Sequence, residues 1–306
     1  MSNTSPQAPK SPRRSLHFVP GANERMFNKA VGLPADALIL DLEDAVTPEN
    51  KSEARALVCD WLQSNTWQRQ EKLVRINPLE SPWGREDLES VMAAKPDGIV
   101  LPKIENAAGV KAVDVLLTAL EKEHGLAPGA TPLVLIGTES AAAVLHLGET
   151  LQQARVTAIA WAAEDMANNL GARRKRDAVG NYLEVFRVAR SLCLLSAVAA
   201  GKQPIDGPFV DLQDTAGLEQ ECQMTADMGY SGKLTIHPSQ IDIVNRVYSP
   251  SGEEIALARE LLDAFAENEK QGLMAFSFRG AMVDVPHRKR ATALLERAAQ
   301  IEQFQA

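Results

Sequence analysis

The sequence of 306 residues is poor in cysteine and lacks any long apolar run. Its three cysteines, Cys59, Cys193 and Cys222, are an odd number without the spacing of a metal site, and each falls in a helix-like segment. None lies at the end of a predicted strand, which disfavours a catalytic cysteine. We therefore expect reduced thiols that pack in the interior.

Positive charge is not in excess either, since the formal net charge is -8. The chain therefore has no general basic surface for nucleic acid or for an anionic membrane. No apolar run approaches the roughly 20 residues that a membrane helix needs, and the N-terminus lacks an apolar signal core. These absences predict a soluble, cytoplasmic protein that binds neither nucleic acid nor membrane, although local Arg and Lys side chains or a metal can still bind anions.

Several common catalytic motifs are also missing. The sequence has no GxGxxG, no Walker P-loop, no HExxH and no G-x-S-x-G elbow, which disfavours dinucleotide redox chemistry, nucleotide hydrolysis and serine-hydrolase chemistry. Ser231-Gly232-Lys233 resembles the end of a P-loop, but Asp227 stands where its first glycine is required.

The first 14 residues are rich in Ser, Pro, Lys and Arg and carry no acidic residue and no periodic apolar pattern. This composition predicts a flexible tail. A mitochondrial targeting segment would share the Arg and Ser content, but the prolines at 6, 9 and 12 disfavour the amphipathic helix that it needs.

From residue 15 to residue 250, apolar strand-like runs alternate with helix-like segments such as Lys51–Ser64 and Ala107–Glu123, the pattern of parallel β/α units. Eight such units predict an α/β fold, a TIM (β/α)8 barrel, with an open doubly wound sheet as the alternative. The predicted strands are Leu16–Val19, Ala37–Leu42, Leu73–Ile76, Gly98–Leu101, Leu133–Ile136, Val156–Trp161, Pro204–Ile205 and Lys233–Ile236.

Residues 251–306 lie outside the eight units and predict a C-terminal extension. Ser251 followed by two acidic residues indicates the start of a helix that runs to Lys270. A short strand and turn over Ala275–Asp284 and a final helix from Val285 to Gln300 follow. Because no low-complexity linker precedes this segment, we expect it to pack on the barrel or on a neighbouring subunit.

Two carboxylates, Glu139 and Asp165, stand just past apolar runs and at the start of the next predicted helices. The carboxyl ends of barrel strands gather reactive side chains, and magnesium favours one or two carboxylates with water and substrate oxygens. Alternatively, both residues stabilise free amides and the dipole at helix N-termini. The spacing alone leaves both interpretations open.

Arg75 is charged at the end of an otherwise apolar run, so it needs an anionic partner. That partner is a substrate carboxylate or oxyanion, or an internal ion pair with Asp41, Glu43 or Asp44. We expect this acidic cluster to position Arg75 rather than to bind metal directly. His237 follows the last predicted strand, where it contacts a ligand or caps the next helix.

Together these segments resemble the HpcH/HpaI aldolase and citrate lyase β-subunit-like (CitE-like) family, which includes malyl-CoA and citramalyl-CoA lyases. The matching stretches follow the family's order through nearly the whole chain after the tail. They are Phe18–Gly21, Arg25–Met26, Lys29–Ala30, Leu40–Val46, Val74–Pro78, Leu101–Lys103, Thr138–Ser140, Glu164–Asp165 and Gly232–Gln240.

The resemblance implies a TIM barrel that holds Mg²⁺ on Glu139 and Asp165 and binds substrate through Arg75 and Glu139, without an organic cofactor. Asn23 occupies a position where some malyl-CoA lyases carry Arg, so Arg25 is the candidate for the CoA phosphates. The other positions that match the substrate and CoA pocket are Phe18, Lys29, Glu164, Ile236 and His237.

The stretch Gly280–Pro286 resembles the lid motif of CoA-thioester lyases, which implies that Asp284 is a catalytic acid/base acting on a neighbouring subunit's site. Its position alone favours a cap of the last helix. The resemblance implies reversible cleavage of a 3-hydroxyacyl-CoA, such as citramalyl-CoA to acetyl-CoA and pyruvate, by a homotrimer or hexamer with catalytic Arg75 and Asp284. The alternatives are a malyl-CoA lyase, a malyl-CoA thioesterase, and a citrate lyase β-like subunit that depends on partner proteins.

Overall fold

The computed structural model describes residues 10–64 and 66–306, and these form two compact units. The first unit ends at Asn245 and the second begins at Arg246. The sequence placed this boundary after residue 250, whereas the division falls within the short helix α10 (Ile241–Val247).

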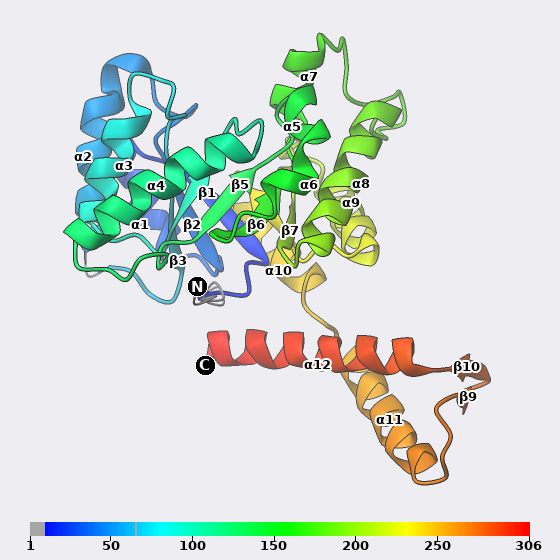
Figure 1. Cartoon of the computed structure of the whole chain (residues 1–306). Helices are drawn as coiled ribbons and strands as arrows, with labels where there is room; N and C mark the ends of the chain where they lie inside the picture. Colours follow the sequence, from blue (N-terminus) through cyan, green and yellow to red (C-terminus); the bar gives the residue numbers. More distant parts are fainter. Residues whose placement is uncertain (1–9, 65) are drawn as a thin grey trace. The chain divides into compact units, whose positions relative to one another are not determined.

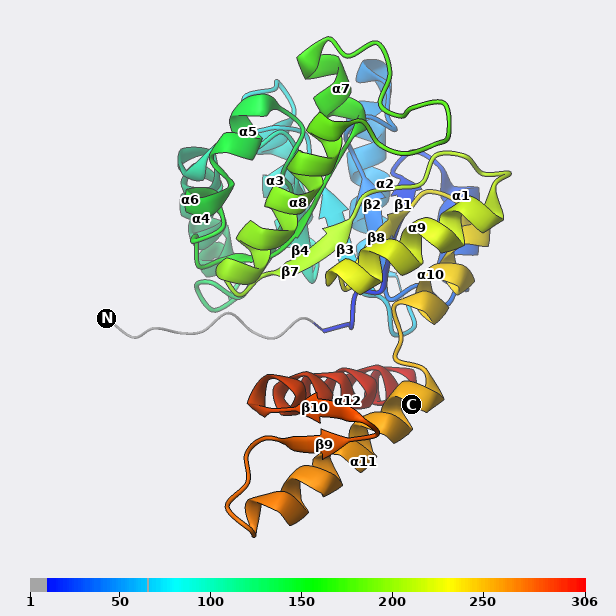
Figure 2. The ribbon, with the colours of Figure 1, turned by 90° about the vertical axis from the view of Figure 1, so that its right-hand side faces the viewer.

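The first unit is the predicted TIM barrel. Eight parallel strands pair in sequence order, and β8 pairs with β1 to close the barrel. Figures 1 and 2 show these strands surrounded by the helices of the same unit. The strands are β1 (Ser15–Pro20), β2 (Ala37–Asp41), β3 (Glu71–Arg75), β4 (Gly98–Leu101), β5 (Leu133–Ile136), β6 (Val156–Ala160), β7 (Gln203–Asp206) and β8 (Gly232–Thr235).

Helices follow the strands, so every strand is parallel to its neighbours. No helix of the described residues is long and apolar enough to span a membrane. The three cysteines are free and lie in α2, α8 and α9. The helices are α1 (Glu24–Ala30), α2 (Lys51–Gln63), α3 (Gly84–Ala93), α4 (Ala107–Glu123), α5 (Ala141–Leu145), α6 (Leu147–Thr150), α7 (Glu164–Leu170), α8 (Glu184–Ala199) and α9 (Thr215–Met228), with short 3₁₀ turns η1 (Pro48–Asn50) and η2 (Pro238–Gln240).

Aliphatic side chains fill the inside of the barrel. Alternate residues point inward, as the two-residue period of a strand requires, and those of one cluster include Leu16, Ile39, Leu73, Val134 and Ile205. Because this interior is a packed core and not a pore, polar groups that act on a ligand must lie at the ends of the strands.

The predicted flexible tail is too long. Residues 1–9 lie outside the described residues, but the prediction is wrong for the residues from Ser11 to Arg14, which are nearly fully buried. Arg13 pairs with Glu71 at 2.6 Å and Arg14 pairs with Asp36 at 2.7 Å. These partners offset the cost of burying two guanidinium groups, and they lie too far along the chain for local composition to reveal them.

Gly232 has a structural role in this region. A Cβ atom at this position would lie 2.0 Å from the carbonyl oxygen of Arg13, so only glycine allows the N-terminal segment to approach β8. The backbone N–H of Lys233 then donates to the Arg14 carbonyl at 2.8 Å. The Ser-Gly-Lys sequence is therefore part of strand pairing, consistent with the absence of a P-loop.

The second unit consists of α11 (Gly252–Glu269), a two-stranded hairpin of β9 (Phe276–Phe278) and β10 (Ala281–Val283), and α12 (Val285–Gln305). Ser251 caps α11, as the sequence predicted, and Glu254 completes a capping box. Arg279 and Gly280 both have positive φ, which allows the tight hairpin turn. The final helix continues five residues beyond the predicted end at Gln300, to Gln305.

Candidate active site

Arg75 lies at the carboxyl end of β3 and is held by two acidic residues, one at the end of β2 and one in the loop that follows it. Its Nε and Nη2 donate to the two carboxylate oxygens of Asp41 at 2.7 and 2.6 Å, and its Nη1 lies 3.0 Å from Glu43 Oε2. The predicted ion pair is thus confirmed. Although burial alone would lower the pKa of Arg75, its bonds to Asp41 and the negative charge of Glu43 raise it above its usual range.

Lys51 holds the loop that carries Glu43 through hydrogen bonds to its backbone. The Lys51 ammonium donates to the carbonyl oxygens of Leu42 and Glu43, each at 2.7 Å, and to Asn77 Oδ1 at 2.8 Å. Asn77 in turn donates to the buried carboxylate of Asp87. Because all three donors of the ammonium are used, Lys51 positions the Glu43 loop and has no N–H left for a ligand.

Glu139 follows β5 and is 5% exposed. Its carboxylate does not cap its own helix, because Ser140 is the N-cap of α5. Instead Glu139 Oε2 accepts the backbone N–H of Lys103 from the loop after β4. Burial, together with the negative charges of Glu43 and Asp165, raises the pKa of Glu139 to about 8, although the Lys103 N–H and the charge of Arg75 act to lower it.

Asp165 is half-buried in the first turn of α7, and its charge acts on Glu139. Two carboxylates at the barrel mouth, one of them destabilised as an anion, form a donor set that a divalent cation would stabilise. Within residues 10–64 and 66–306, no group of three or more His, Cys, Asp or Glu side chains is arranged to hold a metal. The residues therefore fit an ion held by two carboxylates, the arrangement expected from the sequence, rather than an all-protein cage.

Lys103 completes the cluster and was missing from the predicted site. Its ammonium lies 2.8 Å from Glu43 Oε1, while its backbone N–H serves Glu139. Its φ of 54°, rare for a residue with a side chain, turns the N–H toward that carboxylate. The available sequence signal was a lysine two residues after the end of β4, close to the position of Glu139, which comes three residues after the end of β5.

Phe18 is the other predicted residue that contacts the Arg75 cluster. It projects from β1 against the barrel core, and its ring centre lies 4.7 Å from the Arg75 guanidinium carbon. This cation–π contact helps to hold the guanidinium in place, because a cation over an aromatic face is attracted by the ring quadrupole.

The remaining predicted contacts surround the carboxyl ends of β1, β6 and β8. Arg25 and Lys29 are exposed on α1, Glu164 is exposed and ion-paired with Lys175, and Ile236 is 37% exposed after β8. His237 caps η2 by accepting the Ser239 N–H. The expected capping role of His237 is confirmed, while contacts of this group with CoA stay predictions.

Asp284 lies in the second unit, at the N-cap of α12. Its carboxylate oxygen Oδ1 lies 2.6 Å from His287 Nδ1, and the side chain is 48% exposed. The N-cap position predicted from the sequence is confirmed. The exposed carboxylate leaves Asp284 accessible to other groups.

A closed parallel barrel whose cations and carboxylates meet at the carboxyl ends of β2 to β6 has the architecture of a TIM-barrel enzyme. The chain belongs to the HpcH/HpaI aldolase/citrate lyase family, whose model matches residues 14–238.

Its relatives extend this match to nearly the whole chain. The (3S)-malyl-CoA thioesterase of Cereibacter sphaeroides is 37% identical over 295 residues, 96% of this chain and 98% of that protein. The citrate lyase subunit beta of Escherichia coli is 37% identical over 291 residues, 94% of this chain and 93% of that protein. The crystal structure of CitE from Mycobacterium tuberculosis with magnesium, acetoacetate and coenzyme A has a TM-score of 0.78 and 32% identity, and covers 95% of this chain and 99% of that one.

Proposed function

We propose that this protein is a magnesium-dependent carbon–carbon lyase that cleaves citramalyl-CoA reversibly to acetyl-CoA and pyruvate. The observation that carries the proposal is the fixed guanidinium of Arg75 beside the carboxylates of Glu139 and Asp165, at the mouth of a barrel. The similar CitE structures that contain magnesium with coenzyme A and acetoacetate, or with pyruvate, support this choice of ligands.

Glu139 and Asp165 would hold the magnesium, which would supply positive charge to the carboxylate and hydroxyl oxygens of the substrate. Arg75 stabilises the charge that develops on the keto-acid and on the enolate of acetyl-CoA. In cleavage the hydroxyl proton leaves to solvent, the carbon–carbon bond breaks, and its electron pair forms the enolate. Asp284 of a neighbouring subunit delivers a proton to the enolate carbon, so no other co-substrate is consumed.

The CoA part of the substrate is assigned to the residues around β1 and β8. Phe18, Ile236 and His237 would contact the acyl arm, and the exposed cations Arg25 and Lys29 on α1 would bind phosphates. Glu164, next to Asp165, would contact the substrate near the metal.

The metal assignment makes a direct prediction. Glu139→Gln keeps the size of the side chain and an oxygen for the Lys103 N–H, but it removes the charge. Magnesium affinity should fall at least about 100-fold, since changes even outside the ligand set cost 10–100-fold. Isothermal titration with MgCl₂ measures this, and Glu123→Gln, an exposed carboxylate at the end of α4, serves as the control. Unchanged affinity in Glu139→Gln would contradict the assignment.

The main rival is a malyl-CoA thioesterase, in which water replaces carbon–carbon cleavage, and a relative of that name is as similar to this chain as the citrate lyase subunit is. Malyl-CoA lyase differs by one substrate methyl group, a difference that a pocket discriminates by only about 1–3 kcal/mol. A citrate lyase β-like subunit would need partner proteins for turnover.

A direct assay separates these functions. Purified protein with magnesium is given (S)-citramalyl-CoA or malyl-CoA, and pyruvate, glyoxylate, acetyl-CoA and free CoA are followed against an EDTA control. Pyruvate release that EDTA abolishes supports the proposal. Free CoA with intact malate identifies a malyl-CoA thioesterase. Preferential release of glyoxylate and acetyl-CoA from malyl-CoA identifies a malyl-CoA lyase. Turnover only after addition of an acyl-carrier partner identifies a citrate lyase β-like subunit.

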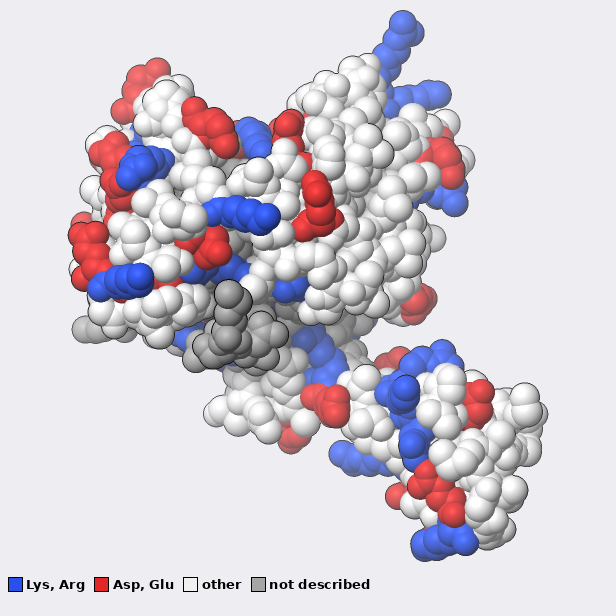
Figure 3. Space-filling model, viewed as in Figure 1, with Lys and Arg blue, Asp and Glu red and all other residues white. Residues whose placement is uncertain are grey.

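We also propose that the protein acts as a homotrimer or a dimer of trimers. Val185, Val188, Leu192 and Leu195 follow one stripe of α8 at three- and four-residue spacing, and all are at least 38% exposed. The surface around α6 and α8 is also largely uncharged on the face in Figure 3. Light scattering should give three or six times 33.2 kDa.

A charge in this stripe should weaken the assembly. We expect Leu195→Glu to reduce the mass toward that of one chain and to reduce activity with it, because burying an unpaired carboxylate in an interface is costly. Val115→Glu on α4, another exposed valine, is the control. A wild-type protein that is fully active as a monomer would contradict the proposal.

A further inference from the structure

A cleft of about 490 Å³ opens beside the Arg75 cluster, between the loops after β2, β3 and β4. This volume falls in the roughly 300–1,000 Å³ range of small-molecule sites. All of its lining belongs to the first unit. The lining residues are Glu43, Asp44, Ala45, Val46, Thr47, Pro48, Lys51, Asn77, Pro78, Ser81, Trp83 and Lys103.

Two residues connect this cleft to the reactive groups. Glu43 contacts Arg75 on one side and Lys103 on the other, and Lys103 donates its backbone N–H to Glu139. A substrate whose carboxylate and hydroxyl lie between Arg75 and Glu139 therefore has the cleft next to it. None of the residues proposed to contact the metal, the acyl group or CoA lines this cleft.

The cleft is suited to an apolar group. Val46, Pro48, Pro78 and the ring of Trp83 contribute much of its wall. The charged residues of the cleft disfavour an anion. The side chain of Asp44 is 56% exposed, and Lys103 is already shared between Glu43 and Asp44. A second carboxylate in the cleft would face Asp44 without a free cation, whereas a hydrocarbon chain would bury against the apolar wall.

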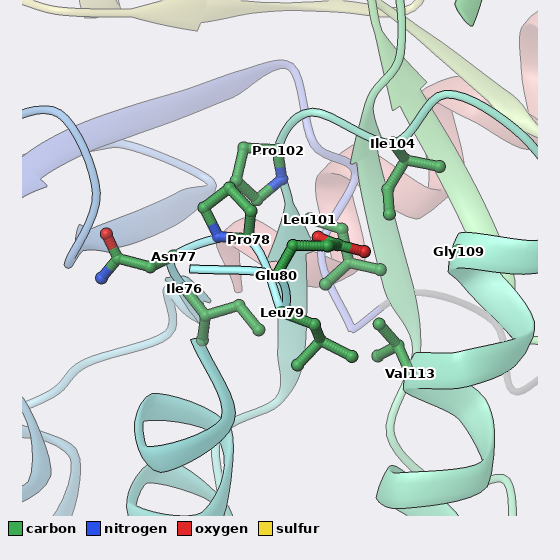
Figure 4. Close-up of a pocket in the computed structure, with 10 residues that line it drawn as sticks. All are labelled: Ile76, Asn77, Pro78, Leu79, Glu80, Leu101, Pro102, Ile104, Gly109 and Val113. Atoms are coloured by element: carbon green, nitrogen blue, oxygen red, sulfur yellow. The ribbon is translucent and has the colours of Figure 1, made fainter. Parts of the chain in front are cut away.

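The wall formed by Asn77 and Pro78 has little space behind it into which it could move to enlarge the cleft. On its other side lies a cavity of only about 10 Å³, lined by residues that include Ile76, Leu101 and Ile104. Figure 4 shows Pro78 beside Pro102 with these side chains around them. Closely packed groups on this side fix the position of the wall.

We infer that the cleft receives the substituent on the hydroxyl-bearing carbon, and that it accepts unbranched apolar chains longer than the methyl group of citramalyl-CoA. This inference rests on the proposed lyase function and extends its substrate class from citramalyl-CoA to 3-hydroxyacyl-CoA esters made from longer 2-oxo acids. In condensation a methyl carbon–hydrogen bond of acetyl-CoA gives up its proton and its electron pair forms the bond to the carbonyl carbon. The carbonyl electron pair then takes up a proton as the hydroxyl, so atoms and electrons balance without a further reactant.

The experiment compares 2-oxo acids in the condensation direction with acetyl-CoA and magnesium. Pyruvate, 2-oxobutyrate and 2-oxovalerate are tested beside oxaloacetate and 2-oxoglutarate, with product thioesters quantified by chromatography. We expect kcat/KM to rise by up to about fourfold for each added methylene, the gain from burying one such group. Calorimetric titration of the 2-oxo acids should show the same order in Kd.

Two variants test whether the cleft causes this order. Ala45→Phe places a large side chain at an exposed position of the lining and should abolish the preference for 2-oxovalerate while pyruvate is still used. Ala119→Phe, on an exposed site of α4 outside the cleft, should keep the wild-type order. Asp44→Asn should raise kcat/KM for 2-oxoglutarate severalfold, since it removes the repelling charge.

The outcomes separate this inference from the lyase proposal. No condensation with any 2-oxo acid would refute the lyase function itself. Condensation with pyruvate but no gain with 2-oxobutyrate or 2-oxovalerate, or an order that Ala45→Phe leaves unchanged, would overturn the role of the cleft. A wild-type preference for oxaloacetate or 2-oxoglutarate would overturn the apolar class of substituent.

Discussion

Replacing Asp284 by asparagine should lower kcat for citramalyl-CoA cleavage by about 10²–10⁴-fold, the usual contribution of a general acid or base. Asp284 is the N-cap of α12, and asparagine is an equally good N-cap, so the helix should still begin at the same residue. Magnesium affinity should be unchanged, because the proposed ligands lie on the barrel. Steady-state kinetics and magnesium titration of the same preparation measure both effects.

Asp214→Asn is the matched control. Asp214 caps α9 in the same way, by accepting the Gly217 N–H at 2.8 Å, so this variant shares the chemistry of the change without a proposed role in catalysis. It should keep wild-type kcat. Cleavage by Asp284→Asn at the wild-type rate would rule out the acid/base role.

Action between subunits has its own signature. Asp284→Asn and Glu139→Gln subunits are each expected to be inactive, but a mixed oligomer can combine an intact barrel from one with an intact Asp284 from the other. Co-expression should restore activity to about a quarter of the sites if mixing is random in a closed ring. A mixture as inactive as its parents would place Asp284 outside the neighbouring site.

The eight strands could be predicted from the sequence because each is a short apolar run, and closed parallel barrels leave few other arrangements. The pairing of Arg75 with Asp41 and Glu43 was also predictable. A charged residue in a buried strand needs a counter-ion, and the neighbouring strand ended in acidic residues. In both cases the residue types within a short segment were enough to predict the structure.

Lys103, Arg13 and Arg14 could not be placed in the same way. The contribution of Lys103 depends on a left-handed backbone conformation that directs its N–H to Glu139. Lysine rarely adopts this conformation, so the sequence did not predict it. The two arginines have partners on β3 and before β2, so their burial depends on the closed barrel. The cleft likewise arises only when the loops after three strands are brought together.

Arg75→Lys should lower kcat by about 10²–10³-fold, the loss expected when one preorganised donor to a developing oxyanion is removed. Two of the five guanidinium N–H groups donate to Asp41, and Nη1 lies 3.0 Å from Glu43 Oε2, which leaves at least two N–H groups for the substrate. Lysine retains the positive charge that these acids require, but it has no planar fork and cannot serve both acids and the substrate at once. Steady-state kinetics with citramalyl-CoA measures the loss.

A stability effect must be separated from this catalytic one, because the cluster is buried. Arg155 offers the comparison: it precedes β6 at the opposite end of the barrel, and its Nη1 lies 2.6 Å from the buried carboxylate of Glu121. Arg155→Lys should lower Tm as much as Arg75→Lys or more, yet leave kcat unchanged. Arg75→Met, which leaves Asp41 and Glu43 without their shared cation, should cost about 3–5 kcal/mol of unfolding free energy. If Arg75→Lys lost stability but kept kcat, Arg75 would hold the acidic loop in place and would not stabilise the reacting oxygens.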